Sequence, residues 1–140
     1  MMTSRLLSGG FVGISHSRNG GNSWNSYKVE KQLINPSCEV STLSAIYQKK
    51  NITLFSGPTH KSKRTNLKIY TSLDNGKNWN CGHFVANKAM YSDLVRSSDG
   101  SLGIIYEKSS WLLEYKVKGI YYKSFDLGEV TGGSKFPCDK

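Results

Sequence analysis

The sequence has little of what defines several large classes of protein. It contains 3 cysteines and 3 prolines in 140 residues, and no apolar run approaches the roughly 20 residues that a membrane-spanning helix needs. Its first ten residues include one arginine but no apolar segment long enough for a signal peptide. The sequence therefore predicts neither a membrane span nor a secretory leader within this chain.

The three cysteines, Cys38, Cys81 and Cys138, are widely spaced, and no two of them form a CxxC pair. An odd number without metal-type spacing argues against a zinc site and against a disulfide framework. We expect free thiols, with Cys38 and Cys81 buried as small hydrophobic side chains.

Acidic residues are scarce: the chain has 10 Asp and Glu but 19 Lys and Arg, so its formal charge is +9. A basic chain can follow a nucleic-acid backbone or attract an anionic substrate. The lysines are scattered without a dense block, which favours a solvated basic surface and no nucleic-acid partner. Arg18 and Arg96 are interpreted as part of that surface.

Hydrophobic residues make up 37 % of the chain and aromatics 11 %, enough for the core of one domain. No segment sustains a 3.6-residue period. Short β-rich runs are instead bounded by Gly, Asn, Asp and Ser clusters, which is typical of strands joined by turns. The alternation in residues 67–71 predicts a half-buried strand, and Asp99-Gly100 predicts a tight hairpin turn. The predicted strands, and with them an all-β class, are Phe11–Ser15, Val40–Tyr47, Ile52–Ser56, Leu67–Ser72, Leu102–Tyr106 and Gly119–Phe125.

The sequence also contains an internal repeat. Residues 17–24 and 72–79 both read Ser-x-(Asn/Asp)-x-Gly-x-(polar)-Trp, and their first residues are 55 positions apart. The Asn or Asp side chain closes such a turn by accepting backbone N–H bonds, and the Gly takes a positive φ. The Trp then covers the hairpin with its indole ring. Two copies at this spacing indicate repeated structural units.

The octapeptide resembles the Asp-box of sialidases, and four further segments resemble sialidase motifs in order and spacing. Residues 3–6 lie where the family has its middle arginine, and residues 56–67 resemble the segment with its last arginine. Residues 91–94, Tyr-Ser-Asp-Leu, resemble the catalytic-tyrosine motif, and residues 99–107 the strand pair that follows it. The chain is thereby identified as similar to the C-terminal part of a sialidase (neuraminidase).

This resemblance implies part of a six-bladed β-propeller, about two and a half to three four-stranded blades whose Asp-box turns link the third and fourth strands. Residues 1–34 would form a partial blade, 35–88 a full blade and 89–128 a terminal blade, followed by a polar tail at 129–140. We expect such a piece, expressed alone, to be poorly soluble or oligomeric, because its edge strands are left open.

The resemblance also implies the site residues. Tyr91 would be the nucleophile, a role in which sialidases use tyrosine rather than a carboxylate. Arg64 and Arg5 would bind the sialic acid carboxylate, because a guanidinium grips a carboxylate in bidentate fashion and stays charged. Glu107 would orient an arginine by an ion pair.

Other polar residues near these motifs receive structural roles. Glu39 is interpreted as structural or blade-edge, and His60 as a solvated loop residue. Ser92 and Asp93 are expected to fix the turn after Tyr91. The family's remaining arginine, its acid/base Asp and the Glu that activates the tyrosine would lie upstream of this segment.

The implied function is an exo-α-sialidase, a glycosidase that releases terminal sialic acid from glycoproteins, glycolipids such as gangliosides, or oligosaccharides by a retaining mechanism. It would need no metal and no cofactor, and this chain alone would be incomplete and inactive. The alternative is a non-catalytic Asp-box protein that binds sialic acid or is vestigial. A lysosomal or extracellular location is favoured if the full-length protein has an upstream leader.

Overall fold

The computed structural model describes residues 1–110 and 116–132, which form ten strands and one short helix. The first three strands are β1 (Met2–Arg5), β2 (Gly10–Ser15) and β3 (Lys28–Asn35). The next four are β4 (Ser41–Tyr47), β5 (Lys50–Pro58), β6 (Leu67–Ser72) and β7 (His83–Ala86). The last are β8 (Ala89–Arg96), β9 (Leu102–Ser109) and β10 (Val117–Phe125), followed by α1 (Leu127–Gly132).

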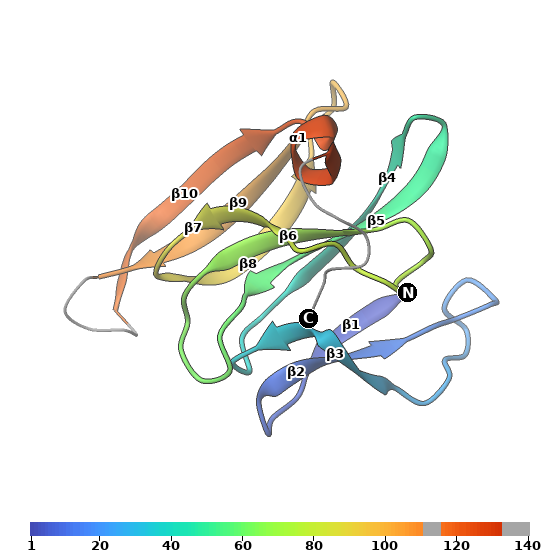
Figure 1. Ribbon diagram of the computed structural model, residues 1–140, viewed down its shortest axis with the longest axis horizontal. Helices are drawn as coiled ribbons and strands as arrows, with labels where there is room; N and C mark the ends of the chain where they lie inside the picture. The colour runs from blue at the N-terminus through green and yellow to red at the C-terminus, as the bar shows by residue number, and fades with distance from the viewer. Residues whose placement is uncertain (111–115, 133–140) are drawn as a thin grey trace.

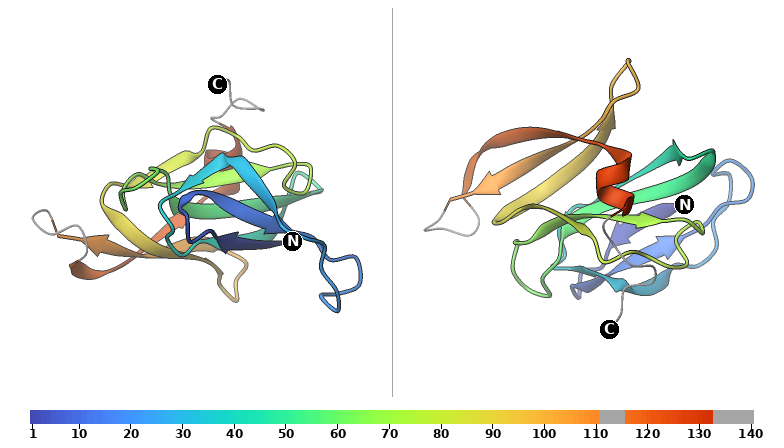
Figure 2. Two further views of the ribbon diagram at one scale, coloured as in Figure 1. Left: turned by 90° about the horizontal axis from the view of Figure 1, so that it is seen from below. Right: turned by 45° about the horizontal axis from the view of Figure 1, so that its top comes forward.

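The strands form three antiparallel sheets, each a meander of consecutive strands (Figure 1). The first sheet is β1-β2-β3, the middle sheet is β4-β5-β6-β7, and the last sheet is β8-β9-β10. Figure 2 shows the three sheets side by side, without closure into a ring. The chain therefore has the all-β fold of part of a β-propeller.

The middle sheet is buried on both faces, because alternate residues of its strands enter different cores. On one face, Leu54 and Ile69 join a cluster with residues of the last sheet and α1. On the other face, Phe55 and Tyr70 pack with residues of the first sheet. The alternation at residues 67–71 thus marks a strand covered on both sides rather than the half-buried strand that we predicted.

The two octapeptide turns, residues 17–24 and 72–79, connect β2 to β3 and β6 to β7, and their serine and Asn or Asp side chains accept the same backbone hydrogen bonds. Ser17 Oγ accepts the Gly21 N–H at 2.8 Å, and Asn19 Oδ1 accepts the Ser23 N–H at 2.9 Å. In the second turn, Ser72 Oγ accepts the Gly76 N–H and Asp74 Oδ1 accepts the Asn78 N–H, both at 2.8 Å. Gly21 and Gly76 have φ values of 94° and 84°, the left-handed conformation that glycine allows without strain.

The tryptophans of these turns differ in their surroundings. Trp79 is fully buried, where it packs edge-on to Phe55 with the ring centroids 5.9 Å apart. Trp24 remains 42 % exposed. The expectation that each indole folds back over its hairpin holds for both turns, since Trp24 Nε1 donates to the Gly21 carbonyl at 2.9 Å, but only the second ring is shielded from solvent.

Each of the six predicted strands lies within or overlaps an observed strand, and the Asp99-Gly100 turn joins β8 to β9. Strands β1, β3, β7 and β8 lie outside the predicted runs. The predicted polar tail differs at residues 129–132, because these belong to α1 and Val130 is fully buried, with its carbonyl accepting hydrogen bonds from the side chains of Thr71 and Asn80. Its remainder, 133–140, lies outside the described residues.

The cysteine prediction is confirmed at one position and wrong at another. Cys38 is a buried free thiol. Cys81, which we expected to be free and buried, is disulfide-bonded and partly exposed. Spacing along the sequence does not reveal a pair that the fold brings together. Cys138 lies outside the described residues.

Candidate functional site

Tyr91 lies near the start of β8, and polar contacts hold this strand against the middle sheet. The hydroxyl oxygens of Ser92 and Ser56, both buried, are 3.0 Å apart. On the opposite face of β8, Ser41 Oγ donates to Asp93 Oδ1 at 2.5 Å. The expectation that Ser92 and Asp93 fix a turn after Tyr91 is therefore wrong, since they join β8 to β5 and β4. Their effect is to fix the strand that carries Tyr91.

Arg64 lies in the loop of residues 59–66 between β5 and β6. The loop is closed by Thr59 Oγ1, which donates to the Asn66 carbonyl at 2.8 Å. His60, expected to be solvated, uses Nδ1 to accept the backbone N–H groups of Ser62 and Lys63 at 3.1 and 3.0 Å. These bonds order the residues directly before Arg64.

The Arg64 guanidinium lies over the ring of Tyr91. Its Cζ atom is 5.0 Å from the ring centroid, which is the geometry of a cation–π contact. The Arg64 Nη1 atom is also 4.0 Å from the sulfur of Met90. A positive charge is thus held beside the phenol, on a half-buried side chain.

Two pockets meet at Tyr91. The Arg5 pocket, of about 330 Å³, is lined by Arg5, at the end of β1, with Thr3, Glu39, Val40 and Tyr91. The Glu107 pocket, of about 250 Å³, is lined by Glu107 of β9 together with Glu39, Tyr91, Ser92, Asp93, Ile105, Tyr106 and Ile120. The structure thus brings Arg5, Arg64 and Glu107 around Tyr91 from three separate parts of the chain.

Cys38 reports on the electrostatics of the same region. Burial raises the pKa of the Cys38 thiol to about 11, the positive charges of Arg64 and Arg5 oppose this rise, and the negative charge of Glu107 adds to it. All three charged side chains therefore lie within electrostatic range of one buried sulfur. Asn35 Oδ1 accepts the Cys38 N–H at 2.7 Å and so fixes the turn that leads into β4.

Glu39, interpreted from the sequence as structural or blade-edge, lies beside Tyr91 in the structure. It is exposed, and it lines both the Arg5 pocket and the Glu107 pocket beside Tyr91. Its position depends on the Asn35–Cys38 turn and on the packing of two sheets. The sequence gives little indication of this position, since Glu39 is marked only as one acidic residue after a cysteine.

Within residues 1–110 and 116–132, no group of three or more His, Cys, Asp or Glu side chains is placed to hold a metal ion. No helix in the same ranges is long and apolar enough to cross a membrane.

A curated sialidase from Micromonospora viridifaciens is 25 % identical to this chain over 130 residues, which are 88 % of the chain and 19 % of that protein. The chain is related to the sialidases. It spans about a fifth of the length of this sialidase relative. No family model matches the sequence.

Solved sialidase structures share the fold. The intramolecular trans-sialidase from Ruminococcus gnavus, crystallised with oseltamivir carboxylate, matches 91 % of this chain and 30 % of its own with a TM-score of 0.71 at 20 % identity. The NanB sialidase from Streptococcus pneumoniae matches 89 % of this chain and 21 % of its own with a TM-score of 0.75 at 17 % identity. A Hadza microbial sialidase, Hz136, matches 91 % of this chain and 25 % of its own with a TM-score of 0.75 at 23 % identity.

Proposed function

We propose that this chain is the C-terminal part of an exo-α-sialidase and carries the nucleophile and two carboxylate-binding arginines of its active site. The observation that carries the proposal is the convergence on Tyr91. Arg64 lies over its ring, and the pockets of Arg5 and Glu107 meet at the same side chain. The three sheets would be two partial blades and one full blade of the propeller.

The proposed chemistry is retaining hydrolysis of a terminal sialic acid. Arg64 and Arg5 bind the substrate carboxylate, because each guanidinium offers paired N–H donors with a permanent charge. The Tyr91 oxygen attacks the anomeric carbon as the glycosidic bond breaks, which forms a covalent glycosyl–tyrosine intermediate. Water then cleaves that bond and releases the sugar.

Two carboxylates complete the proposed site. Glu107, across the Glu107 pocket from Tyr91, orients an arginine by its charge. Glu39 accepts hydrogen bonds from sugar hydroxyl groups, because an exposed carboxylate in both pockets faces any ligand that contacts Tyr91. The acid that protonates the leaving oxygen and the base that activates Tyr91 would come from residues upstream of this segment.

The second candidate is a protein that binds sialic acid without turnover. One observation favours it: Arg64, Arg5 and the exposed Glu39 beside Tyr91 are groups that could hold an anionic sugar whether or not the tyrosine reacts. Both candidates use Arg64 and Arg5 in the same way and differ only in the chemistry at Tyr91.

The test is a fluorogenic sialoside assay on the longest product that contains these residues, with Tyr91→Phe as the decisive variant. We expect the substitution to lower kcat by at least ~100-fold, because it removes the attacking oxygen. Arg64→Ala should weaken sialoside binding by roughly 10- to 100-fold, the usual effect of a lost charged hydrogen bond.

Tyr47→Phe is the matched control, since Tyr47 lies at the end of β4 and lines neither pocket. Turnover that survives in Tyr91→Phe contradicts the nucleophile assignment. Sialoside binding without turnover, weakened by Arg64→Ala, supports the second candidate. The absence of both binding and turnover contradicts both.

A further inference from the structure

A separate pocket lies between the two octapeptide turns. Its volume is about 870 Å³, and its walls come from β2, β3 and both turns. It shares no lining residue with the Arg5 pocket or the Glu107 pocket. The Arg64 loop precedes β6 and the second turn follows it, so the two sites lie at opposite ends of that strand (Figure 1). We call this region the rim pocket.

Hydrogen bonds between the first sheet and the second turn fix the walls of the rim pocket. His16 Nε2 lies 3.1 Å from the Asn75 carbonyl oxygen. Gln32 Nε2 donates to the Lys77 carbonyl at 3.3 Å, and Gln32 Oε1 accepts the Trp79 N–H at 3.2 Å. The cavity is therefore framed by residues far apart in the sequence, in the way a preformed ligand site is.

The charged groups in the lining are mainly positive and unengaged. Among the described residues, the side chains of Arg18, Lys28 and Lys77 make no hydrogen bond or ion pair. The carboxylate in the lining, Glu30, already accepts the Gln32 N–H at 2.7 Å. The pocket thus keeps three cations available to an anionic ligand.

Trp24 provides an aromatic surface beside these cations. Its Nε1 donates to the Gly21 carbonyl at 2.9 Å, so the orientation of the ring is set by its own turn. The second turn has the same serine and Asn/Asp hydrogen bonds, but it buries Trp79 completely, and the Trp79 Nε1 atom has no hydrogen-bond partner among the described residues. Trp24 is 42 % exposed and lines the pocket, so a fixed ring is presented to a ligand.

We propose that the rim pocket binds an anionic saccharide. The C–H face of a sugar ring packs on an aromatic ring, while Arg18, Lys28 and Lys77 bind its carboxylate or sulfate groups. The volume lies within the range of pockets that enclose small organic ligands. This site is independent of the chemistry at Tyr91 and of the proposed sialidase activity.

The test measures binding by the full chain carrying Arg64→Ala, so that the Tyr91 region does not contribute. The probes are a hyaluronan tetrasaccharide for carboxylates, a heparin-derived tetrasaccharide for sulfates, lactose as the neutral sugar, and a short single-stranded DNA. We expect at least one of the anionic saccharides to bind and lactose to bind at least tenfold more weakly. The stronger of the two anionic probes identifies the acidic group.

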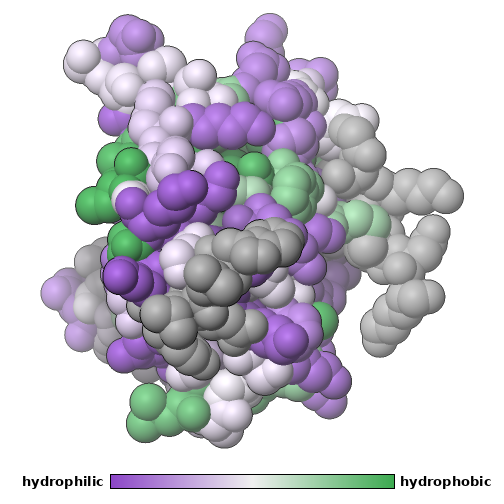
Figure 3. All heavy atoms as spheres, turned by 90° about the vertical axis from the view of Figure 1, so that its left-hand side faces the viewer, coloured by the Kyte–Doolittle hydropathy of each residue, from purple (hydrophilic) through white to green (hydrophobic). Residues whose placement is uncertain are grey.

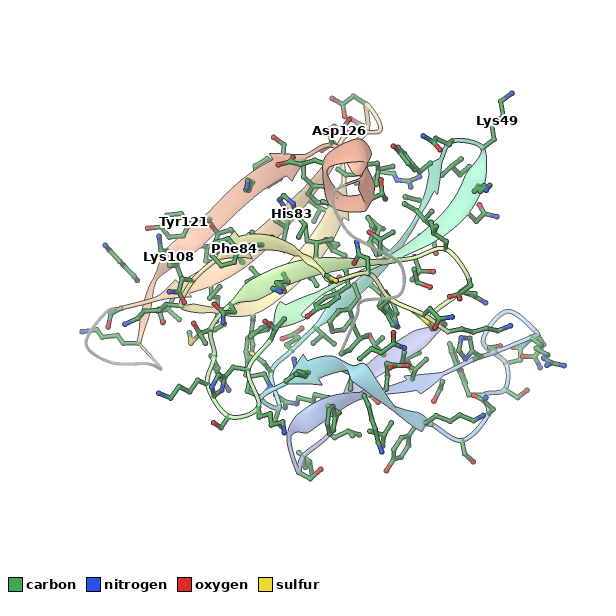
Figure 4. All side chains as sticks on the ribbon, in the orientation of Figure 1. Lys49, His83, Phe84, Lys108, Tyr121 and Asp126 are labelled. Atoms are coloured by element: carbon green, nitrogen blue, oxygen red, sulfur yellow. The ribbon has the colours of Figure 1, made fainter. Side chains whose placement is uncertain are left out.

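Two variants test the residues. Trp24→Ala and the double variant Arg18→Ala/Lys28→Ala should each weaken saccharide binding at least tenfold, and both alter exposed side chains that the fold does not need. The matched control is Lys49→Ala/Lys50→Ala, which removes two exposed charges outside the pocket, at the β4–β5 hairpin where Figure 4 labels Lys49.

Equal weakening in the control and the pocket variants would show charge-driven binding anywhere on the surface and overturn the proposal. DNA bound as tightly as the saccharides, with the same dependence on Trp24, would also overturn it in favour of a nucleic-acid site. Failure of both anionic saccharides to bind overturns it directly. None of these outcomes depends on sialidase turnover.

Discussion

At the scale of single residues, Cys38 and Tyr70 make stability sensitive to alkali. Their ordinary pKa values are 9.0 and 10.0, and burial raises them to about 11 and about 12 in the folded chain. Between those values the folded state keeps protons that the unfolded state has lost, so the free energy of unfolding falls as pH rises from about 9 to about 12. Each shift corresponds to at most roughly 3 kcal/mol.

Urea unfolding at pH 8, 9, 10 and 11 checks this prediction. Cys38→Ala should remove the cysteine's share, so that the loss of stability between pH 9 and 11 becomes smaller in the variant than in the parent chain. An identical pH dependence in both proteins would show that the buried thiol does not contribute.

The sequence motifs named residues that lie near one another in the structure, but they did not reveal the residues that surround them. Tyr91, Arg64, Arg5 and Glu107 were chosen from short motifs, and the fold places them together around one ring; their roles await the assay. A short motif can be recognised in the sequence because its residues are close neighbours along the chain. Glu39 and Cys81 belong to no motif. The residues that surround Glu39 and Cys81 come from distant sheets and loops. No local sequence pattern predicts which of these segments pack together.

At the scale of elements, the two octapeptide turns have the same sequence pattern, but their tryptophans have different surroundings. Trp79→Ala should lower the free energy of unfolding by about 3–5 kcal/mol, because a fully buried aromatic leaves a large cavity in the core shared with Phe55 and Tyr70. Trp24→Ala should cost less than about 1 kcal/mol, because the ring faces solvent. Urea unfolding followed by far-UV circular dichroism compares them.

Asp74→Ala and Asn19→Ala serve as controls for the turns themselves. Each removes an oxygen that accepts a backbone N–H and a serine hydroxyl, so we expect similar losses of about 1–2 kcal/mol. If Trp24→Ala proved as costly as Trp79→Ala, the difference in packing between the two turns would be contradicted.

Strands with β-branched or aromatic residues between clear turn signals were predictable, even the exposed β10, whereas β1, β3, β7 and the largely buried β8 were not. Strands β2, β5, β6 and β9 carry apolar residues for the cores, so composition and turn signals located them. Strand β3 is rich in charged and polar residues because much of it is exposed, and β7 has only four residues. Strands of this kind form because a neighbouring strand supplies their backbone hydrogen bonds, and their own side chains give little sign of them in the sequence.

At the scale of the whole molecule, the middle sheet has both faces covered, whereas the last sheet has one. On the uncovered face of the last sheet, Ile105 is opposite Tyr122, and Ile120 is the next residue on that side of β10. These side chains are 39 %, 55 % and 74 % exposed. The space-filling view in Figure 3 shows green apolar surface among purple polar residues on the side that it faces.

An apolar sheet face without a neighbour promotes association, as do unpaired edge strands. We therefore expect the 140-residue chain, expressed alone, to form dimers or larger species at micromolar concentration. Replacing Ile105 and Ile120 with lysine should shift the distribution toward monomer, because charges on that face oppose its burial. Sedimentation velocity measures the change.

Leu7→Lys is the control, since Leu7 is 92 % exposed in the β1–β2 connection, away from the apolar face of the last sheet. It adds a charge and removes an exposed leucine in the same way, so it should leave association unchanged. A parent chain that sediments as a sharp monomer and melts cooperatively would show that three sheets are stable without further blades. In that case the apolar face of the last sheet would be stable while exposed to solvent. The fold would then not depend on the closure of a ring of blades.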